Sequence, residues 1–380
     1  MDLTLATPLL GGLSADVFMR RHWQKKPLLV RGALPVDGAF VTRAQLFALA
    51  SRDTVESRLI EHGAAGWGLR QGPFKRTALP PLKQGAWTLL VQGLDLHLSG
   101  ARALLDRFRF LPDARLDDVM VSYASDGGGV GPHVDSYDVF LLQLQGRRRW
   151  RIGRIGDPSL LPGVPLKILA AFEPEQEWLL EPGDMLYLPP GWGHDGVAEG
   201  ECLTASIGFR AAGREQLGRE VLQRALDGGE PIDNDPLYRD PKQPATDAPG
   251  RIPPALQAFA ADAVARTLAA PRWLGCALGE VLSEPKPGVW FETATTLTGE
   301  GGKDGVALDR RSRMLYDDWH VFINGESFRA AGRDATLMRR LADQRSLSAR
   351  DRLALSTPAR ELLDDWVAAG WIRTTQERSS

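Results

Sequence analysis

Hydrophobic and polar positions change their period along the chain. Between residues 87 and 210, short β-rich runs such as WTLLVQ, DVMVSYAS, DVFLLQLQG and DMLYLP alternate with Gly/Pro turns. Many short strands of this kind predict an antiparallel sandwich or barrel. After Arg210 the strand signals stop, and apolar residues recur at helical spacing in REQLGREVLQRALD. The fold is therefore predicted to change close to residue 210.

The N-terminal part is predicted to be mostly helical. Ser14 precedes an amphipathic run and is expected to cap its helix, and PLLVRG then reads as a short strand after a Lys-Pro pair. Further helices are predicted over residues 42–58. These elements precede the strand-rich region, so we assign them to the same domain, residues 1–210.

Two helices are predicted after the barrel, one over REQLGREVLQRALD and one near Leu256–Leu268. Both leave apolar faces that need a partner, which could be the barrel or a second copy of the chain. Residues 211–275 are therefore predicted to form a small helical module.

The last hundred residues mix short strands with helices, an order that predicts a winged-helix-like α+β domain over residues 276–380. The predicted elements are strands near Val289–Thr293 and His320–Ile323, helices across Asp334–Asp343 and Pro358–Ala369, and a terminal strand WIRT.

Composition and charge narrow the class of protein. The 380 residues are 43% hydrophobic and 25% charged, with a formal net charge of −2, so no whole-chain field attracts nucleic acid or anionic lipid. Cys202 and Cys276 form neither a disulfide framework nor a zinc motif. The N-terminus lacks a signal peptide, and no run approaches the roughly 18 apolar residues of a membrane span. We expect a cytoplasmic protein without membrane contact.

The segment GGGVGPHVDSYDVF carries the chemistry. Alternate residues of a strand share a face, so His133, Asp135 and Tyr137 are expected to point into the barrel. Downstream, DMLYLPPGWGHDG brings His194 after another strand and a Pro/Gly turn. Two histidines and one carboxylate form the facial triad of non-haem Fe(II) oxygenases. An HxD tripeptide alone is often accidental, but together with His194 it predicts an iron site with open positions for 2-oxoglutarate and O2.

Arg148 is the predicted anchor of 2-oxoglutarate. Strand alternation in the triplet RRR sends Arg148 to the face opposite Arg147 and Arg149. A guanidinium inside a barrel can hold the distal carboxylate through two charge-assisted hydrogen bonds. Ser122 and Ser206 are predicted as hydroxyl partners of the co-substrate.

At these segments the chain resembles the JmjC family of 2-oxoglutarate oxygenases, and within it the bacterial ribosomal oxygenases. The likeness extends from FMRRHWQKKPLLVRGAL through GGGVGPHVDSYDVF and PPGWGHDG to the order of the domains. It implies a double-stranded β-helix, the jelly-roll or cupin-like barrel, followed by a helical dimerisation module and a winged helix. It also implies iron ligation by His133, Asp135 and His194. Arg148 stands where many relatives have lysine.

The resemblance further implies a substrate and partners. Those oxygenases hydroxylate an arginine of a large-subunit ribosomal protein, form homodimers through the helical module, and do not read DNA with the winged helix. From residue 301 onward there are 14 basic and 12 acidic residues, an even balance that independently predicts no direct nucleic-acid binding.

An arginine substrate needs an aromatic face, a soft apolar wall and a carboxylate around its cation. Asp118 and Met120 share one strand face with Ser122, and Tyr137 follows Asp135 by two residues. These three residues, Asp118, Met120 and Tyr137, are the predicted substrate pocket. The competing interpretation is that Met120 and Tyr137 belong to the core and that Asp118 caps a strand end.

Two other functions remain open at this point. The same iron centre could oxidise a small molecule or a methylated lysine. Alternatively, the chain could be a non-catalytic metal-binding regulator with a winged helix. That second alternative predicts nucleic-acid affinity with a steep salt dependence, and it leaves Arg148 without a purpose.

Overall fold

The computed structural model describes residues 2–35, 40–64, 66–227, 237–239, 241, 251–268, 271–293 and 304–375. The chain divides into two compact units, Met1–Ala211 and Ala212–Ser380. This division lies one residue from the change of fold expected at residue 210. The finer separation of a helical module from a winged helix stays a prediction, and its boundary at 275/276 falls inside helix α7 (Pro271–Ser283).

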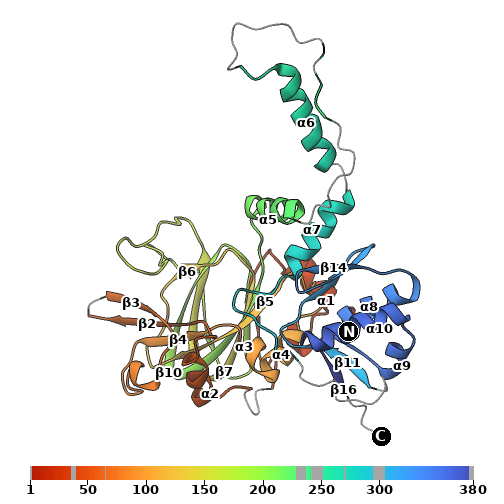
Figure 1. Ribbon diagram of the computed structural model, residues 1–380. Helices are drawn as coiled ribbons and strands as arrows, with labels where there is room; N and C mark the ends of the chain where they lie inside the picture. Colours follow the sequence, from red (N-terminus) through yellow and green to blue (C-terminus); the bar gives the residue numbers. More distant parts are fainter. Residues whose placement is uncertain are drawn as a thin grey trace. The chain divides into compact units, whose positions relative to one another are not determined.

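The first unit is a curved antiparallel sheet with short helices at its edges (Figure 1). Its described helices are α1 (Ala15–Arg21), α2 (Arg43–Ala50), α3 (Leu94–His97) and α4 (Ser99–Asp106), with 3-10 turns at Pro8–Leu10 and Arg76–Ala78. Its described strands are β1 (Leu28–Val30), β2 (Ser57–Gly63), β3 (Gly66–Gln71), β4 (Trp87–Val91), β5 (Leu116–Ala124), β6 (His133–Val134), β7 (Val139–Arg154), β8 (Gln176–Leu180), β9 (Met185–Leu188) and β10 (Trp192–Phe209).

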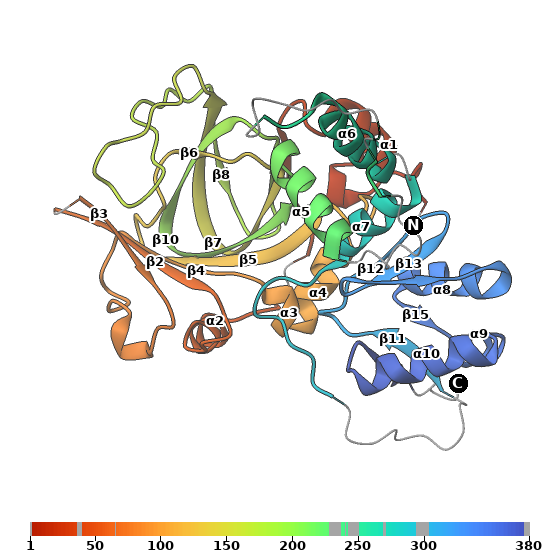
Figure 2. The same cartoon turned by 45° about the horizontal axis from the view of Figure 1, so that its top comes forward.

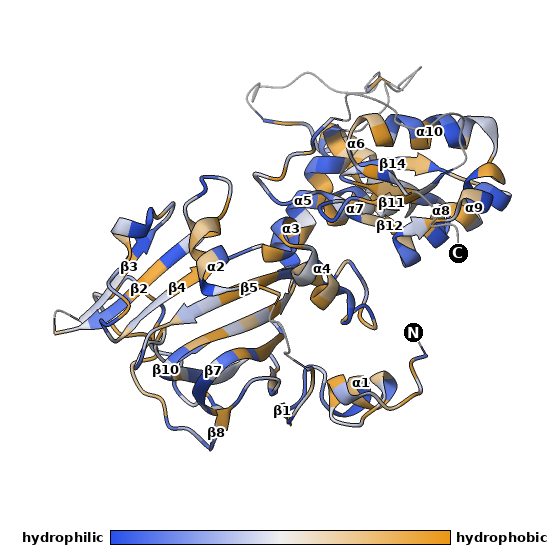
Figure 3. Ribbon diagram, turned by 90° about the horizontal axis from the view of Figure 1, so that it is seen from below, coloured by the Kyte–Doolittle hydropathy of each residue, from blue (hydrophilic) through white to orange (hydrophobic). Residues whose placement is uncertain are grey.

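The strand order is β1-β9-β7-β10-β5-β4-β2-β3, with β6 paired to β10 and β8 paired to β7. Hydrophobic and hydrophilic residues follow one another along β5 and β10 (Figure 3), as expected for strands whose two faces meet different surroundings. One face packs on an aromatic cluster in which Tyr187 lies 5.0 Å from Phe18 and 4.8 Å from Phe140 between ring centres. The other face lines the barrel interior.

The register of β10 fixes the site. On one side His194 lies opposite His133 of β6, and on the other side Ala198 lies opposite Arg148 of β7. Towards the end of β10, Thr204 lies opposite Ser122 of β5. Because side chains alternate along a strand, this one long strand gathers residues from β5, β6 and β7 into the same interior.

Helix α1 confirms the expected start, because the Ser14 side chain accepts a hydrogen bond from the Val17 amide. The helical prediction for residues 42–58 was wrong in its second half. Helix α2 ends at Ala50 and β2 begins at Ser57. Pairing of β2 with both β3 and β4 overrides the local helical propensity there.

The second unit combines helices with two small sheets, and Figure 2 shows its helices beside them. Its described helices are α5 (Arg214–Asp227), α6 (Pro254–Leu268), α7, α8 (Gly332–Gln344), α9 (Ala349–Leu353) and α10 (Thr357–Ala368). Its described strands are β11 (Gly305–Leu308), β12 (Met314–Tyr316), β13 (His320–Ile323), β14 (Glu326–Arg329), β15 (Ser346–Leu347) and β16 (Ile372–Thr375).

These strands form the sheets β15-β11-β16 and β12-β13-β14. Leu337 and Leu341 of α8 and Leu363 and Trp366 of α10 pack with the strands in one core. The strand expected near Val289–Thr293 is absent, and those residues have no regular structure. None of the described helices is long and apolar enough to cross a membrane.

Candidate metal centre

His133, Asp135 and His194 meet in the first unit. His133 lies on β6, Asp135 directly follows that strand, and His194 lies on β10 opposite His133. One possible ligand atom from each residue lies within 4.8 Å of the others. His194 Nε2 is 3.6 Å from Asp135 Oδ2, and the two imidazole centres are 4.2 Å apart. One ion can therefore contact all three side chains.

The backbone orients both imidazoles. His133 Nδ1 lies 2.9 Å from the Gly131 carbonyl, and His194 Nδ1 lies 3.1 Å from the Trp192 carbonyl. A carbonyl oxygen only accepts, so in each ring Nδ1 carries the proton and donates it. The Nε2 lone pairs are thereby left for a metal, which is the usual way in which a ligating histidine is fixed.

The electrostatics of the three side chains suit a cation. Burial lowers the pKa of His194 well below its usual range, and His133 lowers it further, so the ring is neutral as a ligand must be. Burial also raises the pKa of Asp135, which His133 and a hydrogen bond with Tyr137 partly offset. A desolvated carboxylate beside two imidazoles fits a non-haem Fe(II) ion.

A buried carboxylate three residues after Asp135 fixes the segment that carries this ligand. The Asp138 carboxylate is fully buried and accepts hydrogen bonds from the Tyr187 hydroxyl at 2.6 Å and from Gln24 Nε2 at 3.0 Å. This anchors the segment between β6 and β7 to the N-terminal region and to β9.

A cavity of about 390 Å³ opens on the centre. Every residue predicted from the sequence as a site residue lines it, namely His133, Asp135, His194, Arg148, Ser122, Ser206, Asp118, Met120 and Tyr137. Which molecules these residues hold is not shown by their position and stays a prediction.

Arg148 is buried on the interior face, with 3% of its surface exposed. Its Nη1 donates to Ser122 Oγ at 3.1 Å and its Nη2 to the Gly196 carbonyl at 3.0 Å, while Nε has no hydrogen-bond partner. The guanidinium carbon lies 4.9 Å from the ring centre of Trp150. Burial lowers the pKa of Arg148. A buried guanidinium with an unused donor beside a cavity is a suitable binding group for a carboxylate.

The neighbours of Arg148 face the other way, as strand alternation predicts. Arg149 pairs with Glu199 and Glu177 outside the barrel, and Arg147 lies 3.9 Å from Glu199. Ser206 lines the cavity, but it makes no described hydrogen bond with Arg148.

Tyr137 and Asp118 do not lie as strand alternation alone would place them. β6 ends at Val134, so the expected strand does not reach Tyr137; Tyr137 is 39% exposed and hydrogen-bonds Asp135. Asp118 is buried and its Oδ2 accepts from the Gly93 amide at 3.1 Å. Asp118 thus binds the backbone just before α3 and also lines the cavity.

Sequence reasoning missed several lining residues. Arg58 on β2 and Gln92 after β4 both line the cavity, as do Trp150 and Lys167. Arg58 was assigned to a helix. The alternation of GWGLRQ and the Gly/Ala turn of EHGAAG could have indicated the β2–β3 hairpin that carries it.

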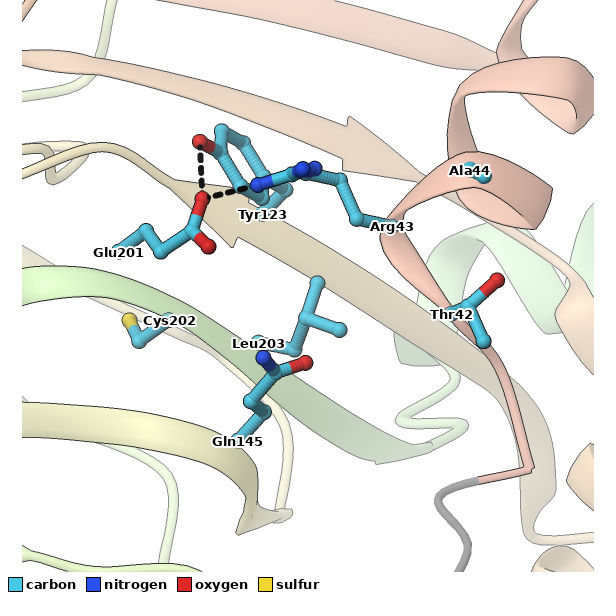
Figure 4. A pocket seen from close by; sticks show the side chains of 8 residues that line it. All are labelled: Thr42, Arg43, Ala44, Tyr123, Gln145, Glu201, Cys202 and Leu203. Carbon is cyan, nitrogen blue, oxygen red and sulfur yellow. Dashed lines mark hydrogen bonds and ion pairs between the residues drawn. The ribbon is translucent and has the colours of Figure 1, made fainter. Parts of the chain in front are cut away.

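A second cavity, of about 310 Å³, lies between the start of α2 and strands β5, β7 and β10 (Figure 4). Glu201 is paired within this cavity, because it accepts from Arg43 at 2.5 Å and from the Tyr123 hydroxyl at 3.1 Å. Burial and Glu201 raise the pKa of Tyr123 to about 12. No histidine lines this cavity, so we assign the metal chemistry to the first one.

Two family models match the chain, the JmjC domain over residues 103–217 and the ROXA-like winged helix over residues 266–373. The ribosomal protein uL16 3-hydroxylase of Escherichia coli is 38% identical over 242 residues, which cover 62% of each chain. A probable ribosomal oxygenase of Haemophilus influenzae is 37% identical over 52% of this chain and 50% of that protein. The chain thus matches less than two thirds of the length of these curated relatives.

The solved structures extend the likeness to nearly the whole chain. YcfD, a ribosomal oxygenase from Escherichia coli, was solved in complex with cobalt and 2-oxoglutarate. It matches 96% of this chain and 99% of its own at 29% identity, with a TM-score of 0.77. Barrel, helices and winged helix therefore follow one another as expected. The chain thus contains segments that match the JmjC domain and the ROXA-like winged helix, and over nearly its whole length it resembles a ribosomal oxygenase.

Proposed function

We propose that the protein is an Fe(II)- and 2-oxoglutarate-dependent oxygenase that hydroxylates an arginine side chain of the large-subunit ribosomal protein uL16. The observation that carries the proposal is that the His133, Asp135, His194 triad and the buried Arg148 open on one cavity. The uL16 3-hydroxylase and the 2-oxoglutarate complex among the relatives support it.

His133, Asp135 and His194 would hold the iron, and Arg148 with Ser122 would hold the distal carboxylate of 2-oxoglutarate. When bound, the iron supplies oxidation of a C–H bond by O2, with 2-oxoglutarate converted to succinate and carbon dioxide. The protein's part is to position the reactants and to limit water. The buried Arg148 sets the depth of the co-substrate, and the N–H groups of Nη1 and Nη2 that Ser122 and Gly196 do not use allow a bidentate grip.

The arginine assignment rests on three further residues of the cavity wall. Asp118 offers a carboxylate, Met120 an apolar wall and Tyr137 an aromatic ring, and all three line the cavity. A guanidinium can stack on the ring and pair with the carboxylate. Because Tyr137 also hydrogen-bonds Asp135, substrate contact at its ring would lie next to the metal ligands.

The regulator hypothesis explains this interior less well. A metal site without turnover does not need Arg148, whose burial lowers its pKa and is therefore unfavourable for the charged form. Keeping such a group in the cavity is reasonable if an anionic co-substrate binds there.

We also propose a homodimer formed through the helices of the second unit, in the cytoplasm where a ribosomal protein is available as substrate. Exposed apolar side chains on α5 and α6 support the dimer: Leu222, Leu226, Phe259 and Val264 are all at least 39% exposed. Sedimentation equilibrium should then give twice the 41.6 kDa chain mass.

The proposed activity is tested by incubating the protein with Fe(II), 2-oxoglutarate, O2 and purified uL16 and measuring succinate. Succinate formation should rise on addition of uL16 and match the number of hydroxyl groups formed. No stimulation by uL16, with 2-oxoglutarate turnover unchanged, would contradict this substrate.

A further inference from the structure

The β2–β3 hairpin extends the cavity wall outward. Its register pairs Arg58 with Gln71, Ile60 with Leu69 and His62 with Trp67. Paired and alternate residues of an antiparallel hairpin share one side. Arg58 and Ile60 line the cavity, so the same side continues beyond the cavity through the other pairs. We call these six residues, Arg58, Ile60, His62, Trp67, Leu69 and Gln71, the hairpin face.

The outer end of the hairpin face carries two stacked aromatic rings, His62 and Trp67, that are not fully buried. The rings of His62 and Trp67 are stacked, with centres 4.1 Å apart and planes 13° from parallel. His62 is exposed and Trp67 is only partly buried. A partly exposed aromatic pair at the end of a hairpin suits contact with another molecule.

Trp67 also reaches the metal-binding segment. A Cβ on Gly131 would lie 3.1 Å from Trp67 Cζ2 and 3.0 Å from Ile168 Cδ1. The Gly131 carbonyl is the group that orients His133. The hairpin face therefore leads directly to the residues that carry the metal.

The inner end of the face carries a cation with donor capacity to spare. Arg58 lines the cavity and its Nη2 donates to Gln92 Oε1 at 2.8 Å, a single bond for a group with five N–H donors. Arg58 would repel a substrate cation placed against it, so its use in an arginine-binding cavity must be different. A main-chain carbonyl of the substrate is an acceptor that fits it.

The size of the cavity requires an outer surface for the rest of a polypeptide. About 390 Å³ is near the lower end of the range of roughly 300–1,000 Å³ for small-ligand pockets. That space suits a co-substrate and one side chain, so the backbone around the target residue has to lie along the cavity opening.

We propose that the hairpin face is the docking surface for the substrate polypeptide next to the hydroxylated residue. Trp67 and His62 pack against a flanking side chain, and Arg58 binds a main-chain carbonyl near the target. The proposal rests on the proposed function, because the occupant is the ribosomal protein segment.

Peptide binding without turnover tests this surface. The protein is loaded with Mn(II) and 2-oxoglutarate under nitrogen and titrated into fluorescein-labelled uL16 peptides, with anisotropy as readout. An extended chain advances about 3.3 Å per residue, so a peptide of about 20 residues passes well beyond the opening, whereas one of about five does not.

Trp67→Ala is expected to weaken binding of the long peptide about tenfold, because it removes an aromatic anchor. Binding of the short peptide should change less than about twofold. Arg58→Gln, which keeps a side chain of similar length, should weaken both peptides. Glu61→Ala is the matched control, because Glu61 lies on the same strand with its side chain on the opposite face.

Failure of the docking surface can be told apart from failure of the proposed substrate. If wild-type protein binds the long peptide but Trp67→Ala binds it as tightly as Glu61→Ala does, the docking surface is elsewhere and the proposed function is untouched. If wild-type protein binds neither uL16 peptide, the proposed substrate is wrong and the docking proposal fails with it. Equal wild-type affinity for both peptides also overturns the docking surface.

Discussion

Arg148 and Gly196 are in direct contact inside the barrel. Arg148 Nη2 donates to the Gly196 carbonyl at 3.0 Å, and the Gly196 Cα faces the guanidinium so closely that a Cβ would lie 2.8 Å from Nε. The same Cβ would lie 2.7 Å from the Trp150 ring. The second glycine of GHDG therefore provides the space in which Arg148 and Trp150 stack.

Gly196→Ala should displace the guanidinium and weaken 2-oxoglutarate binding while the three metal ligands remain. We expect the co-substrate dissociation constant to rise at least tenfold, measured by calorimetry with Mn(II) and without O2. Gly68→Ala is the control, because a methyl group there meets nothing closer than 3.9 Å. Equal affinities in the two variants would show that Arg148 does not bind the co-substrate.

Arg148→Lys should also weaken 2-oxoglutarate binding, because an ammonium cannot reach Ser122 and Gly196 while donating two parallel bonds to a carboxylate. Loss of a buried hydrogen-bonded charge pair costs about 2–5 kcal/mol, and the lysine should recover only part of it. The matched variant Arg149→Lys changes the outward neighbour. A co-substrate affinity in Arg148→Lys that equals the affinity of Arg149→Lys would move the anchor to another residue.

Asp135→Asn should remove metal binding and leave the fold intact. Burial raises the pKa of Asp135, so the folded metal-free protein holds that proton more tightly than the unfolded chain does. The contribution of protonated Asp135 to the stability of the metal-free protein is thus present at low pH and is lost as pH rises through the raised pKa. At neutral pH the metal-free variant should melt at the same temperature as the metal-free wild type or above it, by calorimetry. A much lower melting temperature would mean that the carboxylate is structural.

Two variants of Tyr137 distinguish contact with the substrate from the hydrogen bond to Asp135. Tyr137→Phe removes the hydroxyl that hydrogen-bonds Asp135 and keeps the ring, whereas Tyr137→Ala removes both. If the ring holds the substrate, Tyr137→Ala should raise the peptide KM much more than Tyr137→Phe, with little effect on decarboxylation without peptide. Identical kinetics in the two variants would assign Tyr137 to Asp135 alone.

The sequence predicted the elements that carry strong local signals. His133, Asp135 and His194 were recognisable because a strand alternates its faces and a Pro/Gly turn precedes GHDG. Arg148 followed from the same alternation, since its two neighbours pair with glutamates outside the barrel. The whole JmjC barrel and winged helix then followed from the resemblance.

What the sequence did not predict depends on pairing between distant segments. The helix predicted over residues 42–58 was extended too far, because Arg58 already lies in β2, which is held as a strand by its pairing with β3 and β4. Arg58 was consequently missed. Tyr137 was placed by extending a strand that stops at Val134, and it reaches the cavity from the turn instead.

The mass of a uL16 peptide after reaction is the most direct test of the proposed arginine hydroxylation. With Fe(II), 2-oxoglutarate and O2, the peptide carrying the target arginine should gain about 16 Da, and its arginine-to-lysine version should not, because an ammonium lacks the planar fork that Asp118 and Tyr137 would recognise. Fragmentation should place the oxygen on the arginine side chain. An unmodified arginine peptide, or equal oxidation of the lysine peptide, would contradict the arginine pocket.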